Sequence, residues 1–589
     1  MNEGAWIFSS AGTSDDSARL SRLLHFFGVE AQSGPPADFI KGLATASSQQ
    51  HRLLGSVDDF LVLLRHFATG PEGSQAWRER VHSGFIHVDQ ECDSVLEMFR
   101  LIAAGSDVRL ARVSSPNEWR VSDAMRELCG SMGGLSFSRG ASDPERAIAA
   151  GTSELRIARI IAAGDDVAFL QIYHQGVPLF IVTSPTLIDL DAPAGERGFD
   201  IRTSWLAALP VVMYVRWAFP ERAWKPKTNS ACLIIDDPLL KPRYGFVDYR
   251  NLLRAMHQHR FSTNIAFIPW NWRRSRQSVL KLFQDHPKEY SLSVHGCDHT
   301  AGEFGSTDLS QIQRRLQSAK ERMDGHAAST GVPHHRVMVF PQGVFSTTAM
   351  AALKQSDFVG AVNTEVMSVD APARPLRVAD VWDVAIMSYD GFPIFTRRYP
   401  WQEIANFAFD VLLGKPCLIV IHHDFCRDKN SHLVEFIDQL NTQIPSLTWR
   451  GLGEVLQNSY RWRHITSDCA EIEMYAGELF VENDSAERLH CRITRRNNEP
   501  SCVREVVAGK VNVPWSHTEN HLHFEITLEP GEQKLIRIAF HGAPVPARRP
   551  AGIKYRVKTA MRRYLSEFRD DYLTTMKPAR GEARKLVTK

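Results

Sequence analysis

The stretch Cys232-Leu-Ile-Ile-Asp-Asp237 joins four apolar residues to two adjacent acids. Two other apolar runs end in a similar way: Leu292-Ser-Val294 is followed by His295-Gly-Cys-Asp-His299, and residues 418–421 are followed by His422-His423-Asp424. Short β-branched runs of this kind are typical of buried parallel strands. In α/β folds, the loops that leave the C-terminal ends of such strands build the active site. We therefore expect three strands to bring carboxylates and imidazoles to one polar rim.

Each part of this pattern is weak when taken alone. Paired acids are common on protein surfaces, and a chain with 23 histidines contains a His-x-x-x-His spacing by chance. Solvated acids and histidines do not normally follow buried apolar runs, so the combination is more specific than its parts. Two carboxylates with three or four histidines form the side-chain set of a metal hydrolase.

In this order the residues resemble the polysaccharide deacetylase family, carbohydrate esterase family 4, over residues 226–463. The resemblance implies that Asp236 is the general base and that Asp237 is a metal ligand. It implies that His295 and His299 complete the metal triad. It also makes His422 the general acid, because Ile419-Val-Ile-His422 matches the last motif of the family.

The third motif of the family departs from its usual form. Val339-Phe-Pro-Gln-Gly343 stands in its place, so we expect Pro341, Gln342 and Gly343 to contact the substrate. The arginine that orients the base in the family is absent, because positions 338–340 are Met, Val and Phe. Arg243 and Arg377 are candidates to replace it.

The chemistry of the residues supports the same reading. An Asp-His-His set leaves open positions on a divalent ion, which we expect to be zinc, with cobalt, nickel and iron as alternatives. Consecutive residues of a strand point to opposite faces, so His422 and His423 are alternatives for the acid, and the motif favours His422. Trp270 and Trp272 follow another expected strand and either stack on a sugar or roof the barrel.

Length and composition set the bounds. The 589 residues predict three or four domains, and an apolar content of 43% with 23% charged residues is ordinary for a globular chain. The nine cysteines form no Cys-x-x-Cys pair, so neither a zinc ribbon nor a disulfide framework is indicated. The first residues lack a basic region followed by an apolar core, and we expect a cytoplasmic protein that is at most peripheral to a membrane.

The order of elements predicts an α/β multidomain chain. Residues 1–225 alternate strands and helices, as in a doubly wound α/β domain of unknown role. Residues 226–463 carry at least seven strand candidates, among them 384–387 and 447–449, which alternate with helices and predict a distorted (β/α) barrel of seven or eight strands. Residues 464–545 alternate apolar and polar positions and predict a small β-sandwich.

The tail, residues 546–589, is basic. Positions 548–589 hold 13 Lys and Arg against 4 acids, a net charge of +9, and the apolar residues recur at helical spacing. Such a helix either docks on a membrane surface or an acidic partner, or packs on the body of the chain. We expect no nucleic-acid partner, because no reading motif accompanies the charge.

The sequence thus predicts a metal-dependent deacetylase-like hydrolase that removes an acyl group from an N- or O-acylated sugar or glycan precursor. A metal-dependent C–N hydrolase that acts on a non-sugar amide is one alternative. A non-catalytic barrel that binds glycan or scaffolds polysaccharide assembly is another, and the missing arginine favours it.

Overall fold

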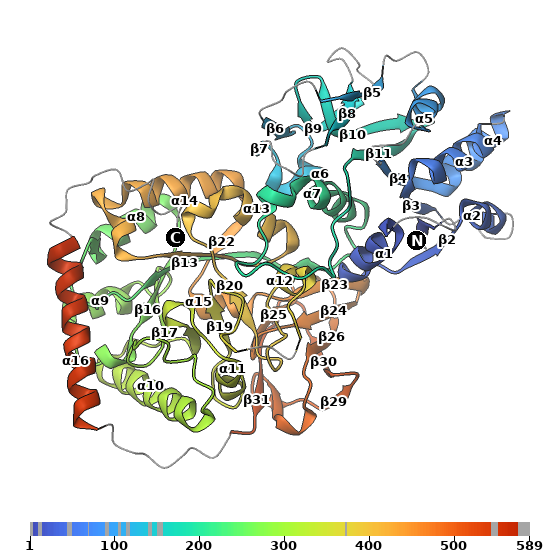
Figure 1. Ribbon diagram of the computed structural model, residues 1–589. Coiled ribbons are helices and arrows are strands. Elements are labelled where there is room, and N and C mark those ends of the chain that lie inside the picture. The colour runs from blue at the N-terminus through green and yellow to red at the C-terminus, as the bar shows by residue number, and fades with distance from the viewer. Residues whose placement is uncertain are drawn as a thin grey trace. The chain divides into compact units, whose positions relative to one another are not determined.

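The computed structural model describes residues 4–9, 15–43, 50–68, 70–88, 94–103, 108–113, 118–138, 144–149, 157–370, 374–542 and 552–574 (Figure 1). The chain forms two compact units. The first contains Met1–Pro193, Phe199–Lys225 and Arg377–Ala379, and the second contains the rest. The C-terminal part of the tail, residues 575–589, and residues 543–551 lie outside the described residues.

The first unit is built on one mixed sheet with the strand order β2-β1-β3-β4-β11-β10-β9-β6-β7. Strands β1 to β4 pair in parallel, and the helices between them follow the expected alternation. The strands are β1 (Gly4–Phe8), β2 (Ala31–Gly34), β3 (His51–Ser56), β4 (Val81–Val88), β5 (Arg109–Arg112), β6 (Glu118–Val121), β7 (Ser136–Ser138), β8 (Arg146–Ala149), β9 (Ile157–Ala163), β10 (Asp166–His174) and β11 (Val177–Thr183). The helices are α1 (Asp16–Phe26), α2 (Pro36–Leu43), α3 (Val57–Phe67), α4 (Gly70–Arg80), α5 (Ser94–Ile102), α6 (Arg126–Cys129) and α7 (Ile201–Ala218).

The doubly wound prediction holds only for the first half of this sheet. β9, β10 and β11 form an antiparallel meander, in which Ala163 pairs with Asp166 and His174 pairs with Val177. Each connection is a two-residue turn containing a glycine with positive φ, Gly164 (φ 60°) or Gly176 (φ 85°). Glycine adopts such angles without steric cost, so these turns form hairpins where a doubly wound sheet needs helical crossovers.

The second unit contains the expected parallel barrel sheet, in the order β20-β19-β18-β17-β16-β13-β21, with β22 paired to β13. Both faces of these strands are buried, because Cys232 and Leu233, neighbours on β13, each have 0% exposure. This explains the continuous apolar runs. The strands are β13 (Asn229–Asp236), β16 (Thr263–Phe267), β17 (Tyr290–His295), β18 (Val337–Val339), β19 (Gly360–Asn363), β20 (Ile394–Thr396), β21 (Cys417–Ile421) and β22 (Leu447–Trp449), and a short hairpin of β14 (Arg243–Tyr244) and β15 (Val247–Asp248) follows β13.

Three helices of the barrel, α8, α10 and α11, begin at capping side chains. Asp248 accepts hydrogen bonds from the backbone N–H groups of Arg250 and Asn251, and Asp308 and Ser346 cap two later helices. The helices are α8 (Tyr249–His259), α9 (Gln277–Asp285), α10 (Leu309–Thr330), α11 (Thr347–Lys354), α12 (Val378–Trp382), α13 (Glu403–Leu413), α14 (Ser431–Gln443) and α15 (Leu452–Gln457).

The barrel closes just beyond β20. Arg398 bridges in parallel to Ile419 of β21, and its backbone N–H donates to the carbonyl of Leu418 over 2.9 Å. The predicted strand at 384–387 is wrong, because Ile386 makes only an isolated bridge to Ile394 and the ring is completed by β20 instead. Arg397, which precedes Arg398, therefore lies at the C-terminal end of the barrel strands, directly after β20.

The C-terminal segment forms two sheets with one shared hydrophobic core that includes Trp462, Ile493 and Ile536. One sheet runs β12-β23-β24-β26-β30-β29, where β12 (Lys225–Pro226) is a short strand that precedes β13 in the chain, and the other runs β25-β31-β27-β28. Their bounds are β23 (Arg461–Thr466), β24 (Cys469–Met474), β25 (Glu478–Glu482), β26 (Leu489–Arg496), β27 (Val503–Ala508), β28 (Val511–Asn512), β29 (Trp515–Thr518), β30 (His521–Leu528) and β31 (Gln533–Phe540).

The tail helix α16 (Ile553–Phe568) continues into one π-helical turn, η8 (Arg569–Leu573), and lies against the barrel (red in Figure 1). Among the described helices, none combines the length and the apolar character that a bilayer crossing requires.

Candidate metal centre

Three side chains converge at the ends of β13 and β17. The Oδ1 atom of Asp237 lies 3.3 Å from Nε2 of His295 and 3.0 Å from Nε2 of His299. All three ligand atoms lie within 4.8 Å of one another. Atoms that hold a tetrahedral zinc ion at about 2.1 Å are roughly 3.4 Å apart, so this spacing suits one divalent ion.

The proton positions also fit a cation. Nδ1 of His295 lies 3.0 Å from the carbonyl oxygen of Val339, which can only accept, so Nδ1 carries a proton and Nε2 is directed at Asp237. Oδ1 of Asp237 is buried and accepts no hydrogen bond from the described residues. Burial alone would lower the pKa of His295, but Asp236 and Asp237 together raise it, so the site favours a positive charge, carried by a proton on Nε2 or by a metal ion in its place.

The loop between the two histidines is held by one buried carboxylate. Glu303 accepts from four backbone N–H groups, those of Cys297 (2.7 Å), Asp298 (3.2 Å), His299 (3.3 Å) and Thr300 (3.3 Å). A Cβ atom on Gly296 would lie 2.1 Å from Oε1 of Glu303, and the φ of Gly296 is +63°. Both observations explain why glycine stands in this motif.

The neighbouring acid, Asp236, forms a buried two-pronged ion pair. Its Oδ1 and Oδ2 atoms each accept from Arg397 at 2.7 Å, and the two side chains are 4% and 3% exposed. Burial alone would raise the pKa of Asp236, but Arg397, His295 and His422 together hold its pKa below the ordinary value. Asp236 is therefore an ionised and fixed carboxylate beside the candidate metal site.

Arg397 is the functional residue that sequence reasoning missed. The candidates Arg243 and Arg377 are both wrong: Arg243 pairs with Asp248 over 3.0 Å, and Arg377 belongs to the first unit, where it pairs with Asp191. The one available signal was the short run Ile394-Phe-Thr396 followed by two arginines, which has the form of a buried strand that ends in charge.

The two adjacent histidines face different surroundings. His422 is exposed, acts electrostatically on Asp236, and has its ring 6.3 Å from that of Tyr399. His423 is buried, and its Nε2 lies 3.4 Å from Oδ1 of Asp570 in η8. This separation is the alternation expected at the end of a strand.

The third-motif residues that were predicted to contact the substrate, Pro341 to Gly343, lie beside the loop that carries His295 and His299. Oε1 of Gln342 accepts from the backbone N–H of Gly302 over 3.3 Å, and Pro341 packs where a side chain on Gly296 would stand. Gly343 has φ +70° and receives Asn363 Nδ2 on its carbonyl at 2.8 Å. Contact of these three residues with a substrate stays a prediction.

The two tryptophans that follow β16 pack against the protein. Trp270 lies edge-on to Tyr564 of α16 at 6.0 Å, and Trp272 packs against Gly325 of α10. A different aromatic pair stands near His422: Tyr399 and Trp401 stack at 4.0 Å with Trp401 46% exposed. Trp270 and Trp272 therefore fit the expectation that they cover the barrel, whereas Trp401 has an exposed ring beside Tyr399.

No family model matches the sequence, and no curated protein matches it as a relative. Among solved structures, a family 4 carbohydrate esterase from Streptomyces lividans in complex with acetate matches at 14% identity, 38% of this chain, 91% of its own and a TM-score of 0.24. A family 4 carbohydrate esterase from Bacillus anthracis matches at 14% identity, 40% and 86% coverage and a TM-score of 0.25. The peptidoglycan deacetylase PdaC from Bacillus subtilis matches at 13% identity, 40% and 93% coverage and a TM-score of 0.24.

Proposed function

We propose that this chain is a metal-dependent deacetylase-like hydrolase that removes an acyl group from an N- or O-acylated sugar or glycan precursor. The observation that supports it best is the convergence of Asp237, His295 and His299 directly beside the buried Asp236–Arg397 pair. An ion site next to an ionised, fixed base is the arrangement that hydrolysis of an acyl bond requires.

Each residue would then have a separate task. A divalent ion held by Asp237, His295 and His299 would acidify water and polarise the acyl oxygen. Asp236 accepts the proton of the attacking water, and Arg397 keeps it ionised and aimed. His422, exposed directly after β21, gives a proton to the leaving amine. The stacked pair of Tyr399 and Trp401 offers a face for a sugar ring.

The non-catalytic alternative loses its main support. It rested on the absence of an arginine for the base, and Arg397 fills that role from another strand. A non-sugar amide as substrate stays an alternative, because the residues at the ion site would contact only the acyl group and not the part of the substrate that carries it. The expected cytoplasmic location stays a prediction.

The test is metal analysis together with turnover on an N-acetylated amino-sugar oligomer, followed by acetate release. Asp237→Ala, His295→Ala and His299→Ala should each lose most of the bound zinc and the activity, because each removes a ligand. Asp236→Asn should keep the ion and lose turnover, because an amide does not take up the proton of water. Unchanged metal content in all three ligand variants would contradict the proposal.

A further inference from the structure

The helix α16 and the turn η8 are held on the barrel by one face. Glu567 forms ion pairs with Lys241 (2.7 Å) and with Arg274. Asp570 accepts from the hydroxyl of Tyr244 over 2.7 Å, and Asp571 accepts from the backbone N–H of Gly245 over 2.8 Å. Near the other end of the helix, the Tyr555 hydroxyl donates to Asp298 over 2.8 Å.

These contacts place the helix across the loops that carry the candidate metal centre. Lys241 and Tyr244 follow Asp237 on the loop after β13, and Asp298 lies between the two metal-ligand histidines. With its inner face fixed on the loops that follow β13, β16, β17 and β21, the helix and its π-helical turn have one defined outer face. That outer face is therefore a property of the fold and not of a freely turning tail.

The outer face is apolar along its whole length. Exposed fractions are 80% for Ile553, 53% for Val557, 60% for Met561 and 63% for Leu565. These positions recur every four residues, which places them on one stripe of the helix. Large aliphatic side chains are normally buried, so a fixed and continuous stripe of this kind marks an interaction surface.

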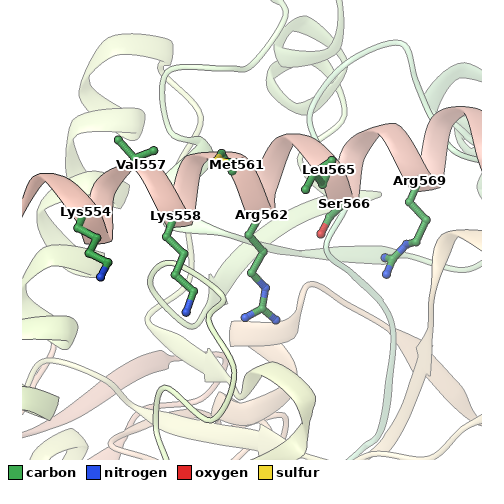
Figure 2. Close-up of a pocket in the computed structure, with 8 residues that line it drawn as sticks. All are labelled: Lys554, Val557, Lys558, Met561, Arg562, Leu565, Ser566 and Arg569. Atoms are coloured by element: carbon green, nitrogen blue, oxygen red, sulfur yellow. The ribbon is translucent and has the colours of Figure 1, made fainter.

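Basic side chains flank this stripe. Figure 2 shows Lys554, Lys558, Arg562 and Arg569 extending from one side of the helix, next to Val557, Met561 and Leu565. The one acid within Ile553–Phe568 is Glu567, and it pairs with Lys241 and Arg274 on the inner face. Arg569 pairs with Asp570 over 2.7 Å, so the outer face combines an apolar stripe with the positive charge of Lys554, Lys558 and Arg562.

We propose that the outer face of α16 docks on an anionic lipid surface. A bilayer accepts the apolar stripe among its acyl chains and the basic groups among its phosphates at the same time. The helix has 16 residues and spans about 24 Å, so it lies in the plane of the surface and does not cross it. A second copy of this chain fits less well, because the two basic flanks would repel each other.

Docking brings the mouth of the barrel to the lipid. Because the inner face of the same helix binds the loops after β13 and β17, the candidate metal centre is held beside the membrane surface. This consequence rests on the proposed function and names its substrate class: an acylated sugar that is carried on a lipid. The docking itself does not depend on catalysis.

The test is co-sedimentation of the full chain with phosphatidylcholine vesicles that contain phosphatidylglycerol, compared with pure phosphatidylcholine vesicles. The chain should bind the anionic vesicles, and binding should weaken as salt is raised. Lys554→Ala combined with Lys558→Ala should weaken binding roughly 30-fold, at about 1 kcal/mol for each basic residue near the surface. Met561→Glu combined with Leu565→Glu should abolish it.

Two matched variants control for non-specific effects. Val511→Glu changes a 68%-exposed apolar residue on β28, and Lys510→Ala removes an exposed basic residue beside it. Both should bind vesicles as the unchanged chain does. Absence of vesicle binding, or equal binding by the α16 variants, would overturn the proposal.

Two further readouts separate the competing outcomes. If the chain forms dimers that Met561→Glu and Leu565→Glu dissociate, and binds no vesicles, the face joins two copies and the lipid proposal is wrong. Vesicle binding by a protein that holds no metal would defeat the proposed function and leave docking intact. Metal-dependent turnover without vesicle binding would support the proposed function and contradict the docking proposal.

Discussion

At the scale of single residues, the pairing of Asp236 with Arg397 decides the protonation of the base. With Arg397→Ala, burial still raises the pKa of Asp236, and the charge that opposed it is gone. The acid limb of the pH profile of kcat/KM should therefore move to higher pH. Breaking a buried pair on one side should also lower the free energy of unfolding by about 3–5 kcal/mol.

Arg398→Ala is the matched control. Arg398 forms a buried ion pair with Asp410 over 2.6 Å, one residue further along the chain. Its loss should destabilise the fold by a similar amount and leave the acid limb where it is. If both variants shift the limb equally, Arg397 has no special relation to the base.

The two histidines should differ in their effect on the leaving group. His422→Ala should lower amide turnover about 10²–10⁴-fold at unchanged metal content, because an amine needs a proton to leave. The loss should shrink for an activated acyl ester, whose leaving group needs none. His423→Ala should show no amide-selective defect, because its imidazole is directed to Asp570. Steady-state rates on the amide and the ester measure this difference, and a larger amide-selective defect in His423→Ala would assign the acid to His423 instead.

At the scale of elements, the loop from Gly296 to Thr300 depends on Glu303. The Glu303→Gln variant keeps the shape but loses the charge that accepts four backbone N–H groups. Such supports typically change metal affinity 10–100-fold, so zinc affinity should fall by about that factor in a competitive titration. Glu321→Gln on the surface of α10 should leave it unchanged, and a full loss of folding would assign Glu303 to stability alone.

The elements that could be predicted are those with a complete local pattern. The apolar runs that became β13, β17 and β21 are buried on both faces, and each ends in the polar residues that form the site. β20 was missed although its short apolar run ends in charge, because its place in the ring depends on closure against β21, which no local pattern shows. Arg397 was missed for the same reason: its partner is set by the ring and not by its neighbours in sequence.

At the scale of the whole molecule, buried neutral histidines tie the stability of the second unit to pH. Burial lowers the pKa of His326 and of His335 to about 4. Nδ1 of His335 accepts from the backbone N–H of Gly453 over 2.8 Å, which requires the neutral ring. The unfolded chain binds protons on both side chains below about pH 6.5, and the folded chain does not until about pH 4.

Stability should therefore fall as the pH drops from about 6.5 to about 4, by up to about 1.4 kcal/mol per pH unit for each histidine. Urea unfolding across this window measures the slope. His335→Gln should reduce it, whereas His432→Gln, whose ring is 67% exposed in the native chain, should not. An unchanged slope for His335→Gln would show that this ring is already charged in the fold.

The long sequence separation between Asp236 and Arg397 also has a consequence for folding during synthesis. Asp236 and Arg397 are 161 positions apart, so the acid leaves the ribosome long before the guanidinium that will neutralise it. Until then β13 can pair with β16, and β16 with β17, but burial of Asp236 at the end of β13 has no compensating charge. A nascent or truncated chain that stops before Arg397 must leave that end of the sheet open to water. When the ring shuts, Asp236 is buried together with the guanidinium of Arg397 and stays ionised, so its low pKa depends on β20 being in place.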